Sequence, residues 1–195
     1  MEQNWRTLRE RLFFTTEDLS ILWGIDRRSA QVQCSRYVKR GLFIRLKKDF
    51  YVLEQNWINY SRDDFLRIAN FLQVPSYISL MTALSIYGVT TQVQRDYFES
   101  ISLRRTISYS VDGKVFDFHK VKRRYYFGFQ RQNGIFIASK EKAFVDAVYL
   151  WSFGRYPLDI ASLDTERLNK KEIMRISEAF PKRSKEAIKR ICGIS

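Results

Sequence analysis

Apolar positions near the start of the chain follow two periods, one typical of helices and one typical of strands. The helical period covers residues 2–12 and returns after Thr15, where Thr15 and Asp18 have the spacing of a capping box. In a capping box, a hydroxyl and a carboxylate satisfy free amide groups of the first helical turn. Gly24 is expected to end this second helix, because a residue without Cβ readily adopts the left-handed conformation of a sharp turn.

A third helix is predicted to begin after Asp26 and to reach about Arg40. Its apolar residues form a single stripe that is expected to be buried: Ala30, Cys34, Tyr37 and Val38. Most of its other positions carry cations or polar groups and should face solvent: Arg27, Arg28, Gln31, Ser35, Arg36 and Lys39. The pattern therefore predicts an amphipathic helix with a basic outer face.

A short β-hairpin is predicted after Gly41. Three apolar residues alternate with three others in the manner of a strand: Leu42, Ile44 and Leu46 with Phe43, Arg45 and Lys47. Residues 47–49 are expected to form the turn and residues 50–53 the return strand. The order of helix, turn, helix and hairpin predicts a winged helix-turn-helix over residues 1–56.

Residues 57–195 are predicted to form a second, mixed domain. Its helices are expected at residues 61–73, 79–87 and 139–152 and in the tail, with Ser61, Ser139 and Asn169 at their starts. Its strands are predicted at residues 97–103, 106–111, 114–121, 124–131 and 135–138. Asp-Gly and Asn-Gly pairs at residues 112–113 and 133–134 favour two-residue hairpin turns. The chain is thus expected to be α+β, with an antiparallel sheet and C-terminal helices following the winged helix.

Charge and composition narrow the class of protein. Lys and Arg number 34 against 21 acidic residues, a net charge of +13, which favours a nucleic-acid partner over an anionic membrane face. No apolar run is long enough to span a membrane, and the start of the chain lacks an apolar signal core. The two cysteines are far apart and there is one histidine, so no zinc cluster is expected. A reducing, cytoplasmic setting fits these features.

A second basic segment lies in the predicted sheet region. It contains Lys120, Lys122, Arg123 and Arg124, and residues 125–127 beside it are aromatic. Cations and aromatic rings together can bind a single nucleic-acid strand through charge and stacking. The alternative interpretation is that the rings belong to the core. The cations would then be a solvated face or contact DNA or a protein partner.

Residues suited to catalysis do not form a recognisable motif. The glycines are scattered, no nucleophile stands in a known motif, and His119 lies alone on a predicted strand, where a packed or surface role is expected. Glu141 and Asp146 are five residues apart and so lie on different faces of their helix. Glu141 is expected to stabilise the helix start, and Asp146 to make a structural hydrogen bond. An enzyme acting on nucleic acid through residues 104–146 is a further alternative.

Four segments, in this order, resemble the AbiEi-type antitoxins of type IV toxin–antitoxin systems, also described as AbiEi-like transcriptional regulators. They are FYVL (50–53), SYISLMTALSIYG (76–88), SLRRT (102–106) with VFDFHKVKRRYYFGF (115–129), and IASKEKAFVDAVYL (137–150). The second is similar to the family pattern YISL-x-x-AL-x-x-x-G, and the last to AS-P-EKA-x-x-D-x-x-Y. The resemblance covers nearly the whole chain.

The resemblance implies a cytoplasmic antitoxin in phage defence rather than an enzyme, without cofactor, metal, membrane contact or small-molecule substrate. The family's winged helix binds inverted repeats in double-stranded DNA upstream of its own operon and represses it. The second domain supports cooperative binding and neutralises a nucleotidyltransferase-like toxin encoded beside it. A protein-interaction module and a stand-alone transcriptional regulator without antitoxin activity are the alternatives.

Site residues follow from the same resemblance. Base reading is expected from Arg27, Arg28 and Gln31. Phosphate contacts are expected from Ser35, Arg36, Lys39, Arg45, Lys47 and Lys48. The basic run at residues 120–124 is the candidate for a second surface, which would contact either DNA or the toxin. Lys140 stands where Pro is common in the family, and the turn at residues 47–49 lacks a glycine. Asp49 is therefore expected to take any positive φ that this turn requires.

Overall fold

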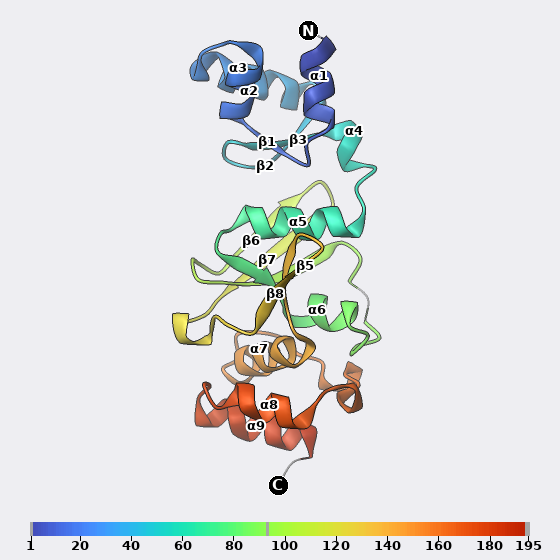
Figure 1. Ribbon diagram of the computed structural model, residues 1–195, viewed down its shortest axis with the longest axis vertical. Helices are drawn as coiled ribbons and strands as arrows, with labels where there is room; N and C mark the ends of the chain where they lie inside the picture. The colour runs from blue at the N-terminus through green and yellow to red at the C-terminus, as the bar shows by residue number, and fades with distance from the viewer. Residues whose placement is uncertain (1, 93, 194–195) are drawn as a thin grey trace. The chain divides into compact units, whose positions relative to one another are not determined.

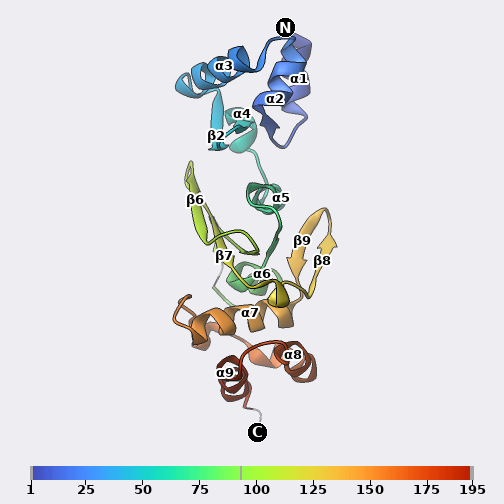
Figure 2. The same cartoon turned by 90° about the vertical axis from the view of Figure 1, so that its left-hand side faces the viewer.

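The structure, a computed structural model, describes residues 2–92 and 94–193 (Figures 1 and 2). Its described part is α+β, as predicted, with nine α-helices and two β-sheets. The chain divides into two compact units: the chain up to Ile68 with Tyr109–Val115, and Ala69–Ser108 with the chain from Phe116 onward. The predicted boundary between residues 56 and 57 falls inside the first unit.

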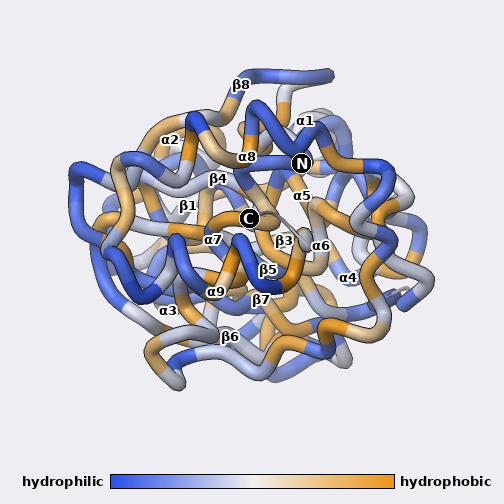
Figure 3. Tube along the Cα trace, turned by 90° about the horizontal axis from the view of Figure 1, so that it is seen from below, coloured by the Kyte–Doolittle hydropathy of each residue, from blue (hydrophilic) through white to orange (hydrophobic). Residues whose placement is uncertain are grey.

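The first unit contains three helices and a small sheet before the chain reaches residue 54. In chain order these elements are α1 (Glu2–Arg9), β1 (Phe14–Thr15), α2 (Thr16–Trp23), α3 (Arg27–Lys39), β2 (Phe43–Lys47) and β3 (Phe50–Leu53). A short helix, α4 (Glu54–Trp57), follows. The strands are antiparallel in the order β1-β3-β2. The hydropathy-coloured trace shows α3 as a mostly hydrophilic segment (Figure 3).

Local capping fixes where α2 and α3 begin. The Thr15 hydroxyl accepts the N–H of Asp18 at 3.0 Å, and the Asp18 carboxylate accepts the N–H of Thr15 at 2.8 Å. Gly24 ends α2 in the left-handed conformation, with φ 63°. The Asp26 carboxylate accepts the N–H groups of the second and third residues of α3, at 2.9 and 3.0 Å. All three capping predictions are confirmed.

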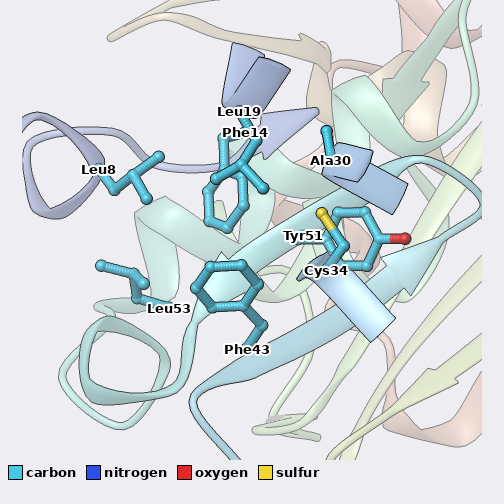
Figure 4. Close-up of a cluster of buried hydrophobic side chains, with 8 residues drawn as sticks. All are labelled: Leu8, Phe14, Leu19, Ala30, Cys34, Phe43, Tyr51 and Leu53. Atoms are coloured by element: carbon cyan, nitrogen blue, oxygen red, sulfur yellow. The ribbon is translucent and has the colours of Figure 1, made fainter. Parts of the chain in front are cut away.

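One hydrophobic core joins the helices of this unit to its sheet. Its buried members are Leu8, Phe14, Leu19, Ala30, Cys34, Phe43, Tyr51 and Leu53 (Figure 4). The predicted stripe of α3 is confirmed, because Ala30 and Cys34 are buried and Tyr37 and Val38 pack against the core. Burial raises the pKa of the Cys34 thiol to about 11. This thiol therefore stays protonated at neutral pH and packs as a small apolar group.

Strand β2 does not follow the strict alternation that the sequence predicted. Phe43 is 2% exposed whereas Leu42 is 41% exposed, so Phe43 rather than Leu42 faces the core. The register against β3 shifts between Arg45 and Lys47, and Leu46 is buried at this irregularity. A bulge inserts one extra residue, and so residues of both odd and even number can face the same side.

Beyond residue 53, the described chain contains one six-stranded sheet and, counting α4, six α-helices. The helices are α5 (Arg62–Leu72), α6 (Leu80–Ile86), α7 (Lys140–Ser152), α8 (Lys170–Ser177) and α9 (Lys182–Cys192), in addition to α4. The strands are β4 (Ser76–Ile78), β5 (Tyr97–Ser102), β6 (Ile107–Val111), β7 (Lys114–Lys120), β8 (Phe129–Gln132) and β9 (Ile135–Ala138), in the order β6-β7-β5-β4-β9-β8. Because β4 pairs parallel to β9 and antiparallel to β5, the sheet is mixed and not purely antiparallel.

The strand predicted at residues 124–131 is wrong in its first half. A 3₁₀ turn occupies Arg123–Tyr125, and β8 begins only at Phe129. The cause is tertiary, because the Tyr125 ring is buried and stacks on Phe180 with ring centroids 4.7 Å apart. The two predicted hairpin turns are confirmed, with positive φ at Asp112 and Asn133.

Candidate nucleic-acid interface

The outer face of α3 forms a shallow, open hollow of about 460 Å³. Its described lining residues are Arg28, Gln31, Val32, Ser35, Arg36 and Lys39. Residues three and four positions apart share one side of a helix, which explains why these side chains gather. Five of the nine residues predicted to contact DNA therefore meet here. The described lining carries three cations and no acid.

Val32 is a member of this face that sequence reasoning did not select. Its side chain is 45% exposed, in the middle of an otherwise polar lining. An exposed β-branched residue between Gln31 and Ser35 offers an apolar contact where the neighbouring side chains offer hydrogen bonds. The helical spacing of residues 28, 32 and 36 was the signal that could have identified it.

Arg27 does not line this hollow. Its Nη2 lies 3.7 Å from Oδ2 of Asp49, in the turn between β2 and β3. Both partners retain exposure to solvent, so this ion pair contributes little to stability. Its consequence is positional: the first residue of α3 contacts the hairpin turn, while Arg28 faces the hollow.

Asp49 adopts φ 61°, which confirms the expectation that it supplies the positive φ of a turn without glycine. Its carboxylate accepts a hydrogen bond from the Thr16 hydroxyl at 3.2 Å, and its carbonyl accepts the Thr16 N–H, also at 3.2 Å. Asp and Asn tolerate the left-handed region better than most residues. The turn is thus connected to the starts of both α2 and α3.

The cations of the hairpin differ in their surroundings. Lys48 is exposed, and so is Arg45, whose Nε donates to the carbonyl of Lys47 at 3.4 Å. Lys47 is half-buried, with its ammonium 4.1 Å from the centroid of the Phe50 ring. Burial lowers the pKa of Lys47. The ammonium of Lys47 thus contacts the Phe50 ring, whereas Arg45 and Lys48 are exposed to solvent.

The second basic segment, Lys120 with Lys122–Arg124, is exposed throughout. The rings beside it pack inward: Tyr125 is 1% exposed, and the half-buried Tyr126 lies 5.0 Å from Tyr77 between ring centroids. Single-strand stacking on these two rings therefore does not fit the structure. Four exposed cations remain as a surface for an acidic partner.

A buried ion pair on α7 was not anticipated. Lys142 is 0% exposed and donates to the Asp146 carboxylate and, at 2.9 Å, to the hydroxyl of Tyr77. Asp146 also accepts from the hydroxyls of Tyr77 and Ser79 at 3.0 and 2.9 Å, which confirms its predicted structural hydrogen bonding. Burial lowers the pKa of Lys142 and raises that of Asp146, and each partner opposes the shift of the other. Their i, i+4 spacing on an apolar helix was the available signal.

Glu141 and His119 have structural contacts. A carboxylate oxygen of Glu141 accepts the N–H of Asn169 at 3.2 Å, at the start of α8. His119 is buried on β7 with its ring 5.4 Å from that of Tyr156. Within residues 2–92 and 94–193, no three His, Cys, Asp or Glu side chains form a group that could hold a metal ion. The helices of the same residues include none that is long and apolar enough to cross a membrane.

Comparison with known proteins gives a similarity of fold but no match of sequence. No known protein family matches the sequence, and the search of curated proteins gave no match. Among solved structures, the fold is similar to that of the RV2827C protein from Mycobacterium tuberculosis, with a TM-score of 0.62 and 11% sequence identity. The similarity covers 98% of this chain and 75% of that chain. At this identity the similarity concerns the fold alone.

Proposed function

We propose that this protein is a DNA-binding antitoxin of the AbiEi type, which represses its own operon and neutralises a nucleotidyltransferase-like toxin. In this proposal α2, α3 and the β2–β3 hairpin form a winged helix-turn-helix. The second domain is proposed to contact the toxin. The observation that carries the DNA-binding part is the basic outer face of α3, which gathers Arg28, Arg36 and Lys39 without an acid among its described lining residues.

The roles of individual side chains follow from their positions on this face. The recognition helix of a helix-turn-helix protein enters the major groove with its N-terminal residues nearest the bases. In this proposal Arg28 forms paired hydrogen bonds with guanine, and Gln31 with adenine. Val32 suits the methyl group of thymine. Ser35, Arg36 and Lys39 lie further along the helix, where phosphates flank the groove.

Arg27 and the hairpin support this surface in different ways. Arg27, paired with Asp49, positions the hairpin beside α3 rather than reading a base. Arg45 and Lys48 are exposed and suited to a phosphate backbone, as is Lys47 through its charge. Base reading is therefore proposed for Arg28 and Gln31, and a positioning role for Arg27.

The test of DNA binding is fluorescence anisotropy with DNA from immediately upstream of the gene, against a scrambled duplex at two salt concentrations. A preference of about a thousandfold that persists at physiological salt is expected, as for specific DNA-binding proteins. Arg28→Ala should weaken specific binding by about 1–3 kcal/mol and leave scrambled DNA nearly unaffected. Arg190→Ala removes the same charge from the exposed face of α9 and serves as the matched control. Equal affinity for both duplexes, lost in salt, would reject sequence-specific binding.

The antitoxin part of the proposal rests on the order of the four sequence segments. It predicts that a neighbouring nucleotidyltransferase-like reading frame arrests growth when expressed alone, and that coexpression of this protein restores growth. A variant with Ala at Lys120, Lys122, Arg123 and Arg124 tests whether the exposed basic segment contributes. Growth arrest that persists with the wild-type protein present would remove the antitoxin assignment and leave a stand-alone regulator.

A further inference from the structure

A second hollow, of about 710 Å³, lies within the second unit. Strand β5 contributes Tyr97 and Glu99 to its wall, β7 contributes Asp117 and His119, and the segment after α7 closes one side. Its volume is in the range of pockets that hold small molecules. None of the DNA-contacting residues proposed above belongs to its described lining, so this hollow is a separate site.

Buried polar groups converge on this hollow. Glu99 is 1% exposed, and its two carboxylate oxygens accept from the Tyr156 hydroxyl at 2.7 Å and from the Thr82 N–H at 3.2 Å. Asp117 accepts from the Tyr97 hydroxyl at 2.8 Å. A carboxylate buried in a low-dielectric wall is costly to ionise unless a counter-charge arrives. Among the described lining residues only His119 can carry a positive charge, against three acids, so the site favours a positively charged ligand.

His119 lines the hollow beside Asp117. Its Nε2 lies 3.0 Å from Oδ2 of Asp117, which is ion-pair distance, although the two atoms are not aligned as a hydrogen bond. The residue is more than nine-tenths buried and lines the hollow. The imidazole therefore shares its charge with Asp117, and the described lining offers no Lys or Arg to Glu99.

The charge of this hollow is opposite to that of the protein. Its described lining contains Glu99, Asp117 and Asp159 but no Lys or Arg, although the chain as a whole carries +13. Three carboxylates against one imidazole disfavour a phosphate or a carboxylate here. The described lining also includes Trp151, the strongest ring type for cation–π contact.

We propose that this hollow binds a small organic cation, an amine or amidine with an apolar or aromatic part. The positive group lies between Glu99 and Asp117, and the apolar part packs against Trp151. The ligand is bound and not converted, so the proposal adds a ligand site and no reaction. It does not depend on DNA binding or on a toxin partner.

The first test uses three probes of the same shape and different charge: benzamidine, benzamide and benzoate. Isothermal titration calorimetry with the wild-type protein should show benzamidine binding about tenfold or more tightly than benzamide, since a charge-assisted hydrogen bond is stronger than a neutral one. Benzoate should not bind. Equal affinity for the three probes, or no heat from benzamidine up to its solubility limit, would overturn the proposal without any variant.

The second test locates the site. Benzamidine should shift the indole N–H signal of Trp151 in a ¹H–¹⁵N spectrum, assigned through Trp151→Phe among the four tryptophans of the chain. Glu99→Gln with Asp117→Asn should reduce benzamidine affinity by about tenfold or more, and Asp63→Asn, an exposed residue of α5, should not. Circular dichroism verifies that the double variant is folded. A Trp151 signal that does not move while benzamidine binds would place the probe elsewhere and refute the assignment.

Discussion

Burial of Glu99 predicts a pH dependence of stability that a single isosteric substitution should remove. Burial, partly offset by the Tyr156 hydroxyl, raises the pKa of Glu99 from 4.5 to about 7. His119, Asp117 and the Thr82 N–H also face this carboxylate. Between pH 4.5 and 7 the folded protein keeps a proton that the unfolded chain has lost. The free energy of unfolding therefore falls as pH rises through this window.

The size of the effect follows from the two pKa values. A difference of one pKa unit corresponds to 1.36 kcal/mol, so a rise from 4.5 to about 7 amounts to roughly 3 kcal/mol. This contribution is complete below pH 4.5 and is lost above pH 7. Glu99→Gln keeps the shape of the side chain but cannot ionise. Its free energy of unfolding therefore lacks this pH-dependent contribution.

The assay is urea denaturation of wild type and Glu99→Gln at intervals between pH 4.5 and 8.5. The difference in the free energy of unfolding, wild type minus variant, should fall by roughly 3 kcal/mol across this range. Other titrating groups are common to both proteins and cancel to first order. Glu17→Gln, at an exposed carboxylate of α2, is the matched control and should give a flat difference. A flat difference for Glu99→Gln would refute the reasoning.

Two further predictions concern stability. Thr15→Ala removes the hydroxyl that accepts the Asp18 N–H and should lower the free energy of unfolding, measured by urea denaturation, by about 1 kcal/mol. Thr15→Ser keeps a hydroxyl and should lower it much less. Equal losses for the two variants would argue against the cap. Lys142→Met leaves the Asp146 carboxylate buried without its cation and should cost about 3–5 kcal/mol. Adding Asp146→Asn should recover part of this loss, because a neutral amide can still accept from Tyr77; no recovery would contradict the charge argument.

The features that the sequence predicted correctly are those determined within a few residues. Helix starts at Thr15, Ser139 and Asn169 depend on a side chain and an amide three residues later, and each is present. Hairpin turns at residues 112–113 and 133–134 depend on two residues that tolerate positive φ. The buried stripe of α3 depends only on helical periodicity.

The features that the sequence did not predict depend on residues far apart in the chain. The 3₁₀ turn at residues 123–125 arises because Tyr125 packs on Phe180. Arg27 pairs with Asp49 and does not line the hollow on α3. These two residues come together only in the folded chain. In the acidic hollow, Glu99 accepts a hydrogen bond from Tyr156, which lies 57 positions away in the chain. No local sequence pattern predicts a contact at this separation.

The contacts of Asp49 have a consequence for how a ligand would meet this surface. Because they link the hairpin turn to the starts of α2 and α3, these contacts favour one spacing between hairpin and helix in the free protein. A surface that is ordered before association loses less conformational entropy when its ligand arrives. Under the proposed DNA binding, preorganisation of this kind would add selectivity for shape to selectivity for charge, because a groove of different width would be accommodated by breaking the Asp49 contacts.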